Sequence, residues 1–188
     1  MQIENSERLR FEQVTKEDAQ LLFDLNQDPE VMRYINGGKP STMAEIEDYF
    51  IPRIEGFTNR DTGWGLWKVT TLASETSLSD SFIGWILVRP MDFYTDTPKL
   101  EDLEVGWRFT QASWGKGYAT EAAKTVCQAL VKHSQSNGNP VTHFSAIADP
   151  ANKGSINIMT KLGMQYIKND SVDTPDGEVE VVLYSMPV

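Results

Sequence analysis

The sequence predicts a single α/β domain, of the mixed α+β kind, that spans residues 1–188. Three observations lead to this expectation. The chain length of 188 residues suits one domain with a core of its own. Stretches that alternate apolar and polar residues, typical of strands, lie between stretches with helical spacing and capping residues. Their order is a meander of strands followed by strand, helix, strand, helix and strand, which indicates a mixed sheet.

The N-terminal part is predicted to hold one strand and three helical segments, over residues 8–14, 16–27, 28–35 and 42–57. Thr15, with Asp18 three residues later, is typical of a capped helix start. Pro29 opens the short third segment, since proline suits the first turn of a helix. Ser41 is expected to cap the last helix, and Pro52 to kink or interrupt it, because proline lacks the amide hydrogen that a helix uses.

The middle of the chain is predicted to be mainly β structure. Strands at 65–72 and 81–90 form a hairpin around the polar loop 72–80, and the turn-rich stretch 91–102 leads to a strand that begins at Leu103. Alternation assigns the side chains of this strand to two faces. One face holds Leu103, Val105, Trp107 and Phe109, and the other holds Glu104, Gly106 and Arg108.

The C-terminal part is predicted to alternate helices and strands. The expected elements are a helix from 118 to about 134, a strand at 141–149, a helix at 152–163 and strands at 164–170 and 178–188 around a TPDG turn. Small and apolar residues recur in the first helix at three- and four-residue spacing, which indicates an amphipathic helix. They are Ala119, Ala122, Ala123, Val126, Cys127, Leu130 and Val131. Gly163 is the expected end of the second helix.

Charge and composition limit the function classes. The formal net charge of −10 argues against broad binding to nucleic acid or to an anionic membrane, because both need a basic surface. It favours a cationic substrate such as an amine, although acidity also serves solubility. No apolar run approaches the length of a membrane span, and the first residues lack the order of a signal peptide, so we expect a cytoplasmic protein.

The stretch WGKGYA, directly before the helix at 118, suggests an anion site. Glycines allow backbone amides to approach a bulky anion, and a helix N-terminus carries partial positive charge. A tight strand-to-helix turn would also explain Gly115 and Gly117. A Walker A loop is excluded, because it would need glycine at Thr110 and Ser or Thr at Gly117. The dinucleotide fingerprint is excluded as well, because its third glycine position holds Thr120.

A different motif fits this region. The string EVGWRFTQASWGKGYATEA resembles the acetyl-CoA-binding motif of the GNAT N-acetyltransferase superfamily, in particular its RimJ/RimL-like branch of ribosomal-protein N-acetyltransferases. NQDPEVMRYI and NKGSINIMTKLGM are similar to further elements of that branch, and the resemblance covers roughly residues 8–186 in the expected order. Two positions depart from the pattern, namely Trp114 for Gln or Arg and Met164 for Phe.

The resemblance implies the GNAT acyl-CoA N-acyltransferase fold, with a mixed central sheet of about six to seven strands and helices on both faces. It also implies that acetyl-CoA is the cosubstrate, with the pyrophosphate on the glycine loop and Lys116. The pantetheine arm would pair with the strand and splay it from 141–149. The implied cofactor-binding residues are Trp107, Arg108, Phe109, Trp114, Gly115, Lys116, Gly117, Tyr118, Ala119, Thr120 and Asn152. Asn152 can also be a helix N-cap.

Two residues are candidates for proton transfer. Glu104 matches the strand glutamate of the family and is our first choice for the base that deprotonates the amine, directly or through water. A salt-bridged strand carboxylate is the other interpretation. Asp149 is the second choice, or else caps the next turn. Ser155 resembles a serine of the branch and is the candidate donor to the departing thiolate.

The sequence therefore predicts an N-acetyltransferase that moves the acetyl group of acetyl-CoA directly to an amine within a ternary complex. The acceptor is a protein N-terminal α-amine, such as that of a ribosomal protein, or a small-molecule amine. The alternative is a non-catalytic acetyl-CoA sensor or interaction domain. A homodimer is one of the oligomeric states left open. Cys127 is expected to be buried rather than nucleophilic, and His133 and His143 lack ligand spacing, so no metal site is predicted.

Overall fold

A computed structural model describes residues 1–73, 78–138, 140–174 and 177–188 of the chain. The expected loop 72–80, the stretch SNGNP after the long helix and the TPDG turn lie partly outside these residues. Within them, seven strands form one mixed sheet, as the α/β class predicts. In chain order the strands are β1 (Leu9–Gln13), β2 (Gly65–Thr71), β3 (Phe82–Met91), β4 (Lys99–Phe109), β5 (His143–Ala148), β6 (Gln165–Thr174) and β7 (Gly177–Pro187).

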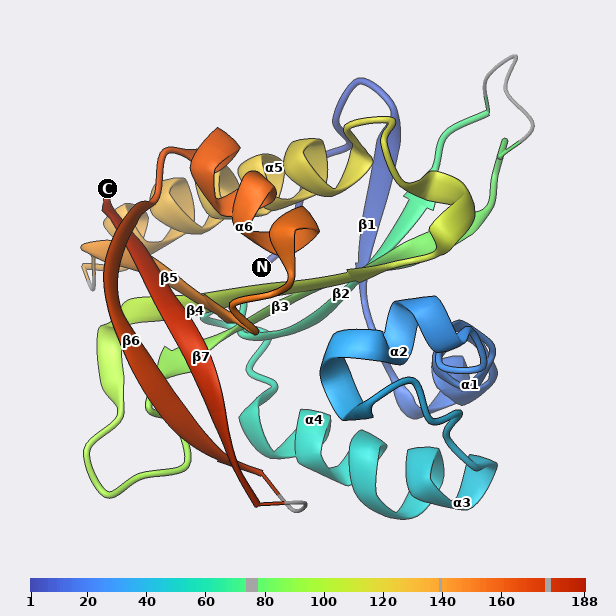
Figure 1. The fold of residues 1–188 in the computed structure, drawn as a ribbon. Coiled ribbons are helices and arrows are strands. Elements are labelled where there is room, and N and C mark those ends of the chain that lie inside the picture. The colour runs from blue at the N-terminus through green and yellow to red at the C-terminus, as the bar shows by residue number, and fades with distance from the viewer. Residues whose placement is uncertain (74–77, 139, 175–176) are drawn as a thin grey trace.

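The strand order across the sheet is β1-β2-β3-β4-β5-β7-β6. Strands β1 to β4 are an antiparallel meander, and β5 then runs parallel to β4. A parallel neighbour requires a crossover, and the helix between these two strands supplies it. Strand β7 lies between β5 and β6, antiparallel to both, and the β6–β7 hairpin forms the red end of the ribbon (Figure 1).

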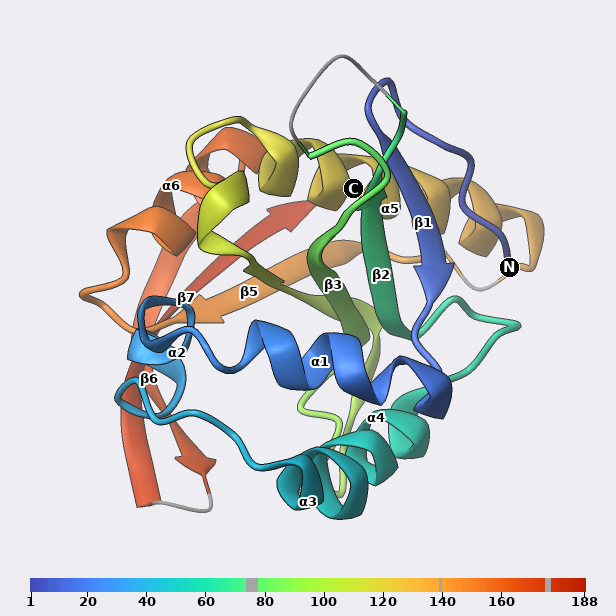
Figure 2. The same ribbon diagram turned by 90° about the vertical axis from the view of Figure 1, so that its right-hand side faces the viewer.

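Helices cover both faces of the sheet (Figures 1 and 2). On one face lie α5 (Tyr118–Ser136) and α6 (Lys153–Leu162), and on the other lie α1 (Ala19–Leu25), α2 (Pro29–Asn36), α3 (Met43–Glu45) and α4 (Ile51–Phe57). Each face has its own hydrophobic core. Among the described residues, no helix combines the length and the apolar character that a membrane span requires.

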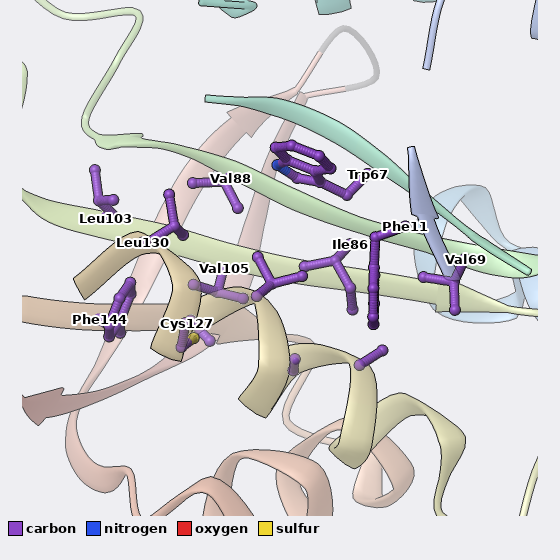
Figure 3. Packing of buried hydrophobic residues seen from close by; sticks show 14 of the residues in the cluster. Phe11, Trp67, Val69, Ile86, Val88, Leu103, Val105, Cys127, Leu130 and Phe144 are labelled. Carbon is purple, nitrogen blue, oxygen red and sulfur yellow. The ribbon is translucent and has the colours of Figure 1, made fainter. Parts of the chain in front are cut away.

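The core beneath α5 follows the pattern expected from the sequence. Leu103 and Val105 of β4 are almost fully buried against the helix, together with Leu130 of α5, and Figure 3 shows them between helix and sheet. Ala122 and Ala123 are fully buried and bring the helix backbone close to the strands. Burying a leucine side chain of this kind stabilises the fold by about 2 kcal/mol, so the apolar stripe of α5 is what fixes the helix on the sheet.

Two expectations about element boundaries are wrong. Thr42, not Ser41, caps the helix that begins at Met43: the Thr42 hydroxyl accepts from the Glu45 amide and Glu45 accepts from the Thr42 amide, a capping box. The Ser41 hydroxyl instead accepts from the Asn26 side chain. Strand β4 begins at Lys99 rather than Leu103. Lys99 pairs with Met91 of β3, and the first three residues of the strand are exposed, so no apolar alternation marks this start in the sequence.

The expected interruption at Pro52 is confirmed and has a specific form. Residues Ile46–Phe50 form a π-helical segment between α3 and α4, and Pro52 lies in the first turn of α4. A proline cannot donate to the preceding turn and its ring would clash with the carbonyl there, so the widened segment accommodates it without ending the helix.

Strands β4 and β5 pair over only three positions and then separate. Asp102, Leu103 and Glu104 face residues of β5, whereas the rest of β4 up to Phe109 is paired only with β3. The edge of β4 from Val105 onward is therefore free on the β5 side. This divergence, expected from the family resemblance, opens the sheet beside the glycine loop.

Gly84 of β3 holds the end of β4 at close range. It pairs with Phe109, its φ is +148°, and a Cβ at this position would overlap the carbonyl oxygen of Arg108 and lie 2.7 Å from Phe109 Cα. Only glycine fits here, since L side chains rarely adopt this φ and the obstructing atoms belong to the backbone.

We expect Gly84→Ala to lower the free energy of unfolding by about 3 kcal/mol or more, from backbone strain together with overpacking. Gly106→Ala on β4 is the matched control: its Cβ would meet only the Leu87 side chain, at 3.3 Å, and its φ is ordinary. Urea denaturation measures both. Equal losses in the two variants would contradict the proposed backbone clash.

Candidate active site

A cleft of about 520 Å³ opens where β4 and β5 diverge. Its walls come from α2, the end of β4, the loop that precedes α5, the start of α5, and α6 with the residues just before it. The predicted cofactor residues that line it are Trp107, Arg108, Phe109, Trp114, Gly115, Gly117, Tyr118, Ala119, Thr120 and Asn152, and Ser155 lines it too. The fold thus brings together residues that lie up to about 48 positions apart in the sequence.

The loop before α5 is held by its own backbone. Thr110 begins a short 3₁₀ turn, the Ser113 hydroxyl donates to the Thr110 carbonyl, and the Trp114 indole donates to the Phe109 carbonyl over 2.8 Å. Gly115 and Gly117 then take left-handed conformations, with φ of +73° and +82°. These two glycines reverse the chain so that the helix begins at the cleft.

The first turn of α5 has no side-chain cap. Gly117 is the N-cap residue and carries no side chain, so no hydroxyl or carboxylate accepts from the helix start. In the described part of the structure, the amides of Tyr118, Ala119 and Thr120 have no acceptor, and the first intrahelical bond is donated by Glu121. Unpaired amides at the start of a 19-residue helix favour a bound anion, and phosphate is the group that such sites usually hold.

Arg8 of the N-terminal segment fixes this helix start. Its Nη1 donates to the Lys116 carbonyl at 3.1 Å, its Nε donates to Glu121 at 2.7 Å, and its guanidinium lies 4.4 Å from the Tyr118 ring centroid. The Ser6 hydroxyl donates to Glu121 as well. A carboxylate in the first turn would repel a phosphate, and Arg8 neutralises it. The sequence does not predict this role of Arg8, since nothing in the local pattern around residue 8 connects it to residue 121.

The cleft is cationic although the protein is acidic. Four of its lining residues carry positive charge and one carries negative charge: Arg33, Arg108, Lys153 and Lys161 against Glu30. The net lining charge of +3 contrasts with −10 for the chain. The three exposed cations of this set, Arg33, Lys153 and Lys161, suit a phosphorylated ligand, whereas Arg108 is buried. The α2 and α6 residues in this set were not predicted, because each lies on a helix whose pattern indicates only a solvated face.

Lys116 takes a different position from the one expected. Its ammonium donates to the Ala112 carbonyl at 2.9 Å, within its own loop, and it is exposed and does not line the cleft. Asn152 does what both of its interpretations require: it caps α6 by accepting from the Ser155 amide at 3.0 Å, and it lines the cleft.

Ser155 and Trp107 meet across the opening. The Trp107 indole donates to Ser155 Oγ at 2.9 Å, which joins β4 to the first turn of α6. Because this oxygen accepts the indole hydrogen, the hydroxyl hydrogen of Ser155 remains available to a second partner. The pair was predicted only as two separate residues, because sequence spacing does not show a contact over 48 positions.

The two candidate carboxylates do not line the cleft. Glu104 is 8% exposed on the opposite face of β4 and is bound by Arg89, with Nε 2.7 Å from Oε2. Burial alone would lower the pKa of Arg89, but attraction to Glu104 raises it above its usual value. Glu104 Oε1 has no hydrogen bond within the described residues. Asp149 accepts from the Ala151 amide at 2.7 Å, which is the turn-capping role.

Other reactive groups are placed away from the cleft. Cys127 is buried in the core beneath α5 and does not line the cleft, as expected. The His133 ring contacts the Asp61 carbonyl and Asn137 at the far end of α5. Across residues 1–73, 78–138, 140–174 and 177–188, no three His, Cys, Asp or Glu side chains form a group suited to a metal ion.

The fold and the cleft define an acyl-CoA N-acyltransferase architecture, and sequence comparison gives the family. The model of the acetyltransferase (GNAT) domain matches residues 8–165, so this chain belongs to the GNAT acetyltransferase family. As a member of this family, it is an acetyl-CoA-dependent acetyltransferase. A curated relative, the uncharacterized protein YkkB of Bacillus subtilis, is 29% identical over 164 residues, covering 87% of this chain and 85% of YkkB.

Two solved structures with bound coenzyme A share the fold. The aminoglycoside acetyltransferase AAC(6')-Ib has a TM-score of 0.69 at 16% identity, covering 95% of this chain and 94% of the other. RimL, the ribosomal L7/L12 α-N-protein acetyltransferase, has a TM-score of 0.70 at 10% identity, covering 99% and 97%. At these identities the two likenesses establish the fold alone, and it is the fold expected from the sequence.

Burial raises the pKa of the Cys127 thiol to about 12, so the group stays protonated at neutral pH. We therefore expect a disulfide reagent such as DTNB to modify folded protein at pH 8 at least about 100-fold more slowly than urea-unfolded protein. Absorbance of the released aromatic thiolate measures both rates. Rapid modification of the native protein would show that the packing beneath α5 is not closed.

Proposed function

We propose that the cleft binds acetyl-CoA and that the protein transfers its acetyl group to an amine in a ternary complex. The observation that supports this most strongly is the uncapped start of α5, with three unpaired amides facing a cationic cleft beside a free strand edge. Family membership favours catalysis over the alternative of a sensor that only binds the thioester. We also infer that the chain belongs to the RimJ/RimL-like branch and works in the cytoplasm.

The cofactor residues divide into three groups. The amides from Gly115 to Thr120 would hold the pyrophosphate, with Lys116 adding positive potential from outside the cleft. The free edge of β4 at Trp107 to Phe109 would pair with the amides of the pantetheine arm. Asn152 would hydrogen-bond the same arm from the α6 side. When bound, acetyl-CoA supplies the acetyl group and a thiolate leaving group.

Ser155 is the proposed proton donor to the thiolate. Its hydroxyl lies in the cleft and accepts from Trp107, which orients its hydrogen away from the indole. A hydroxyl whose oxygen already accepts a hydrogen bond donates more strongly, since hydrogen bonds in a chain polarise one another. Trp107 is therefore a positioning residue for Ser155 in addition to a cleft wall.

Glu104 is the proposed base, acting through water. It is buried on the face of β4 that carries the α1–α4 helices, and Arg89 fixes one oxygen while Oε1 has no partner in the described structure. An α-amino acceptor is the easiest amine for such a base to deprotonate. Its pKa is about 7.7 to 8.0, so roughly one α-amino group in six to ten is neutral at pH 7, against about one lysine side chain in two thousand.

The glycine loop is tested by two substitutions with equal intrinsic strain. Gly115 and Gly138 both have φ of +73°, and a Cβ at either would meet nothing within 4 Å. We expect Gly115→Ala and Gly138→Ala to destabilise the fold by a similar amount, about 1 kcal/mol. Only Gly115→Ala is expected to raise the dissociation constant of coenzyme A, by about fivefold or more. Calorimetric titration decides, and unchanged affinity in Gly115→Ala would contradict the assigned phosphate site.

The proton-transfer roles are tested by thiol release from acetyl-CoA. We expect Ser155→Ala and Glu104→Gln each to lower kcat at least tenfold, about 1.4 kcal/mol of barrier, with coenzyme A affinity retained. Trp107→Phe keeps an aromatic ring, although a smaller one, and removes the donor, so it should lower kcat less than Ser155→Ala does. If Glu104→Gln loses stability while kcat is unchanged, the residue serves only the ion pair with Arg89.

A further inference from the structure

Arg108 is a buried cation without a counter-ion. Only 9% of the residue is exposed, and no carboxylate of the described residues lies within ion-pair distance of it. Its Nη1 donates to Asn26 Oδ1 at 2.6 Å and contacts Met32 Sδ at 3.5 Å. Burial lowers the pKa of Arg108 to about 10, so the guanidinium is still charged at neutral pH. A buried, unpaired charge is costly, and folded proteins normally pair it.

Unpaired donors cluster at this position. In the described part of the chain, only two buried side-chain nitrogen or oxygen atoms lack a hydrogen-bond partner, and they are Arg108 Nε and Trp85 Nε1. The two residues are direct partners in the β3–β4 register, and the guanidinium lies 5.0 Å from the Trp85 ring centroid. Buried donors left without partners are rare in native proteins and call for an acceptor.

The free edge of the guanidinium has the shape that carboxylates select. Trp85 and Phe50 pack near its faces, with ring centroids 5.0 Å and 5.8 Å from the central carbon, and Asn26 and Met32 contact Nη1. Among the described residues, no hydrogen bond is made by Nε, which is buried, or by Nη2, so the edge without a partner is the one with these two parallel N–H groups. This edge binds the two oxygens of a carboxylate in a bidentate manner.

The location points to the acceptor rather than to the acetyl donor. Arg108 lines the cleft, yet its side chain lies on the face of β4 that packs against α1, α2 and the π-helical segment. Trp107 and Ser155 lie on the other face, with α6. A thioester carbonyl is neutral and would not balance the guanidinium charge, whereas a carboxylate would.

We propose that Arg108 and Trp85 bind a carboxylate of the acceptor, so that the substrate is an amine that also carries a carboxylate. This inference rests on the proposed acetyl transfer and specifies its acceptor class. A zwitterionic amino acid has no net charge, so the field of a protein with net charge −10 does not repel it. The shared chemistry covers free amino acids and peptides that begin with Asp or Glu.

The test compares matched acceptors in the thiol-release assay with acetyl-CoA. The panel holds the twenty amino acids, each beside its carboxamide, and C-terminally amidated peptides that begin with Asp or Glu beside those with Asn or Gln. We expect the acid of at least one pair to have at least tenfold higher kcat/KM than its amide. The pair that shows this preference identifies the source as a free amino acid or a peptide N-terminus.

Three variants then assign the preference to the residues. Arg108→Met should reduce it to less than about threefold, mainly through KM, with coenzyme A affinity changed by less than about threefold. Trp85→Phe keeps an aromatic ring, although a smaller one, removes Nε1 and should weaken the preference partly. Arg33→Met is the control, because Arg33 is an exposed arginine that lines the same cleft, and it should leave the preference unchanged.

Thermal unfolding separates a structural role from recognition. Removing an unpaired buried charge should leave the melting temperature of Arg108→Met equal to or above that of the wild type. If Arg108→Met is less stable and keeps the acid preference, the proposal fails. If Arg108→Met does not fold, Trp85→Phe takes its place, and an unchanged acid preference in Trp85→Phe contradicts the proposal. Equal turnover of acids and amides, or coenzyme A binding with no panel member acetylated, also overturns it. Absence of coenzyme A binding overturns the proposed function instead.

Discussion

The start of α5 without a capping side chain is the constraint on which the site depends. A helix of 19 residues must leave its first amides without intrahelical partners, and a Ser, Thr, Asp or Asn usually compensates for this. Here Gly117 stands at that position, and the amides point toward a cleft that is bounded by β4 and α6. The loss of a cap is tolerable because Arg8, directly before β1, holds the loop, and because the proposed ligand can take the place of the cap.

The distribution of charge follows the same logic. The chain is strongly acidic as a whole, but the cleft lining holds four cations and one carboxylate, and Glu121 in the first turn of α5 is paired with Arg8. The proposed anion binding therefore depends on where the charges lie rather than on the net charge. The two faces of β4 hold different polar groups. Trp107 and Ser155 meet on the α6 side, while Arg108, Trp85 and the Arg89–Glu104 pair lie on the side of the N-terminal helices.

Much of the fold could be predicted from the sequence, since periodicity reports burial. The alternation in β4 and the stripe of α5 predicted the correct faces, and the glycine motif predicted the part of the cleft lining that comes from β4, the loop and the start of α5. The predicted boundaries were wrong where burial does not determine them. Lys99 belongs to β4 because it pairs with β3, and Thr42 rather than Ser41 caps α3 because it forms a reciprocal capping box. Contacts between distant segments, such as Arg8 with Glu121 or Trp107 with Ser155, leave no local pattern.

The position of β7 has a consequence for how the molecule is made. This strand follows every other strand in the sequence, yet it lies between β5 and β6 and holds β5 by pairing from His143 to Ala148. During translation the meander can fold first, because its contacts join strands that are neighbours in the sequence. Strand β5 and the α6 wall of the cleft reach their final arrangement only when the β6–β7 hairpin pairs with β5. A nascent chain that ends before residue 177 thus has the glycine loop but lacks the strand that pairs with β5, and its cleft is complete only after the final hairpin has formed.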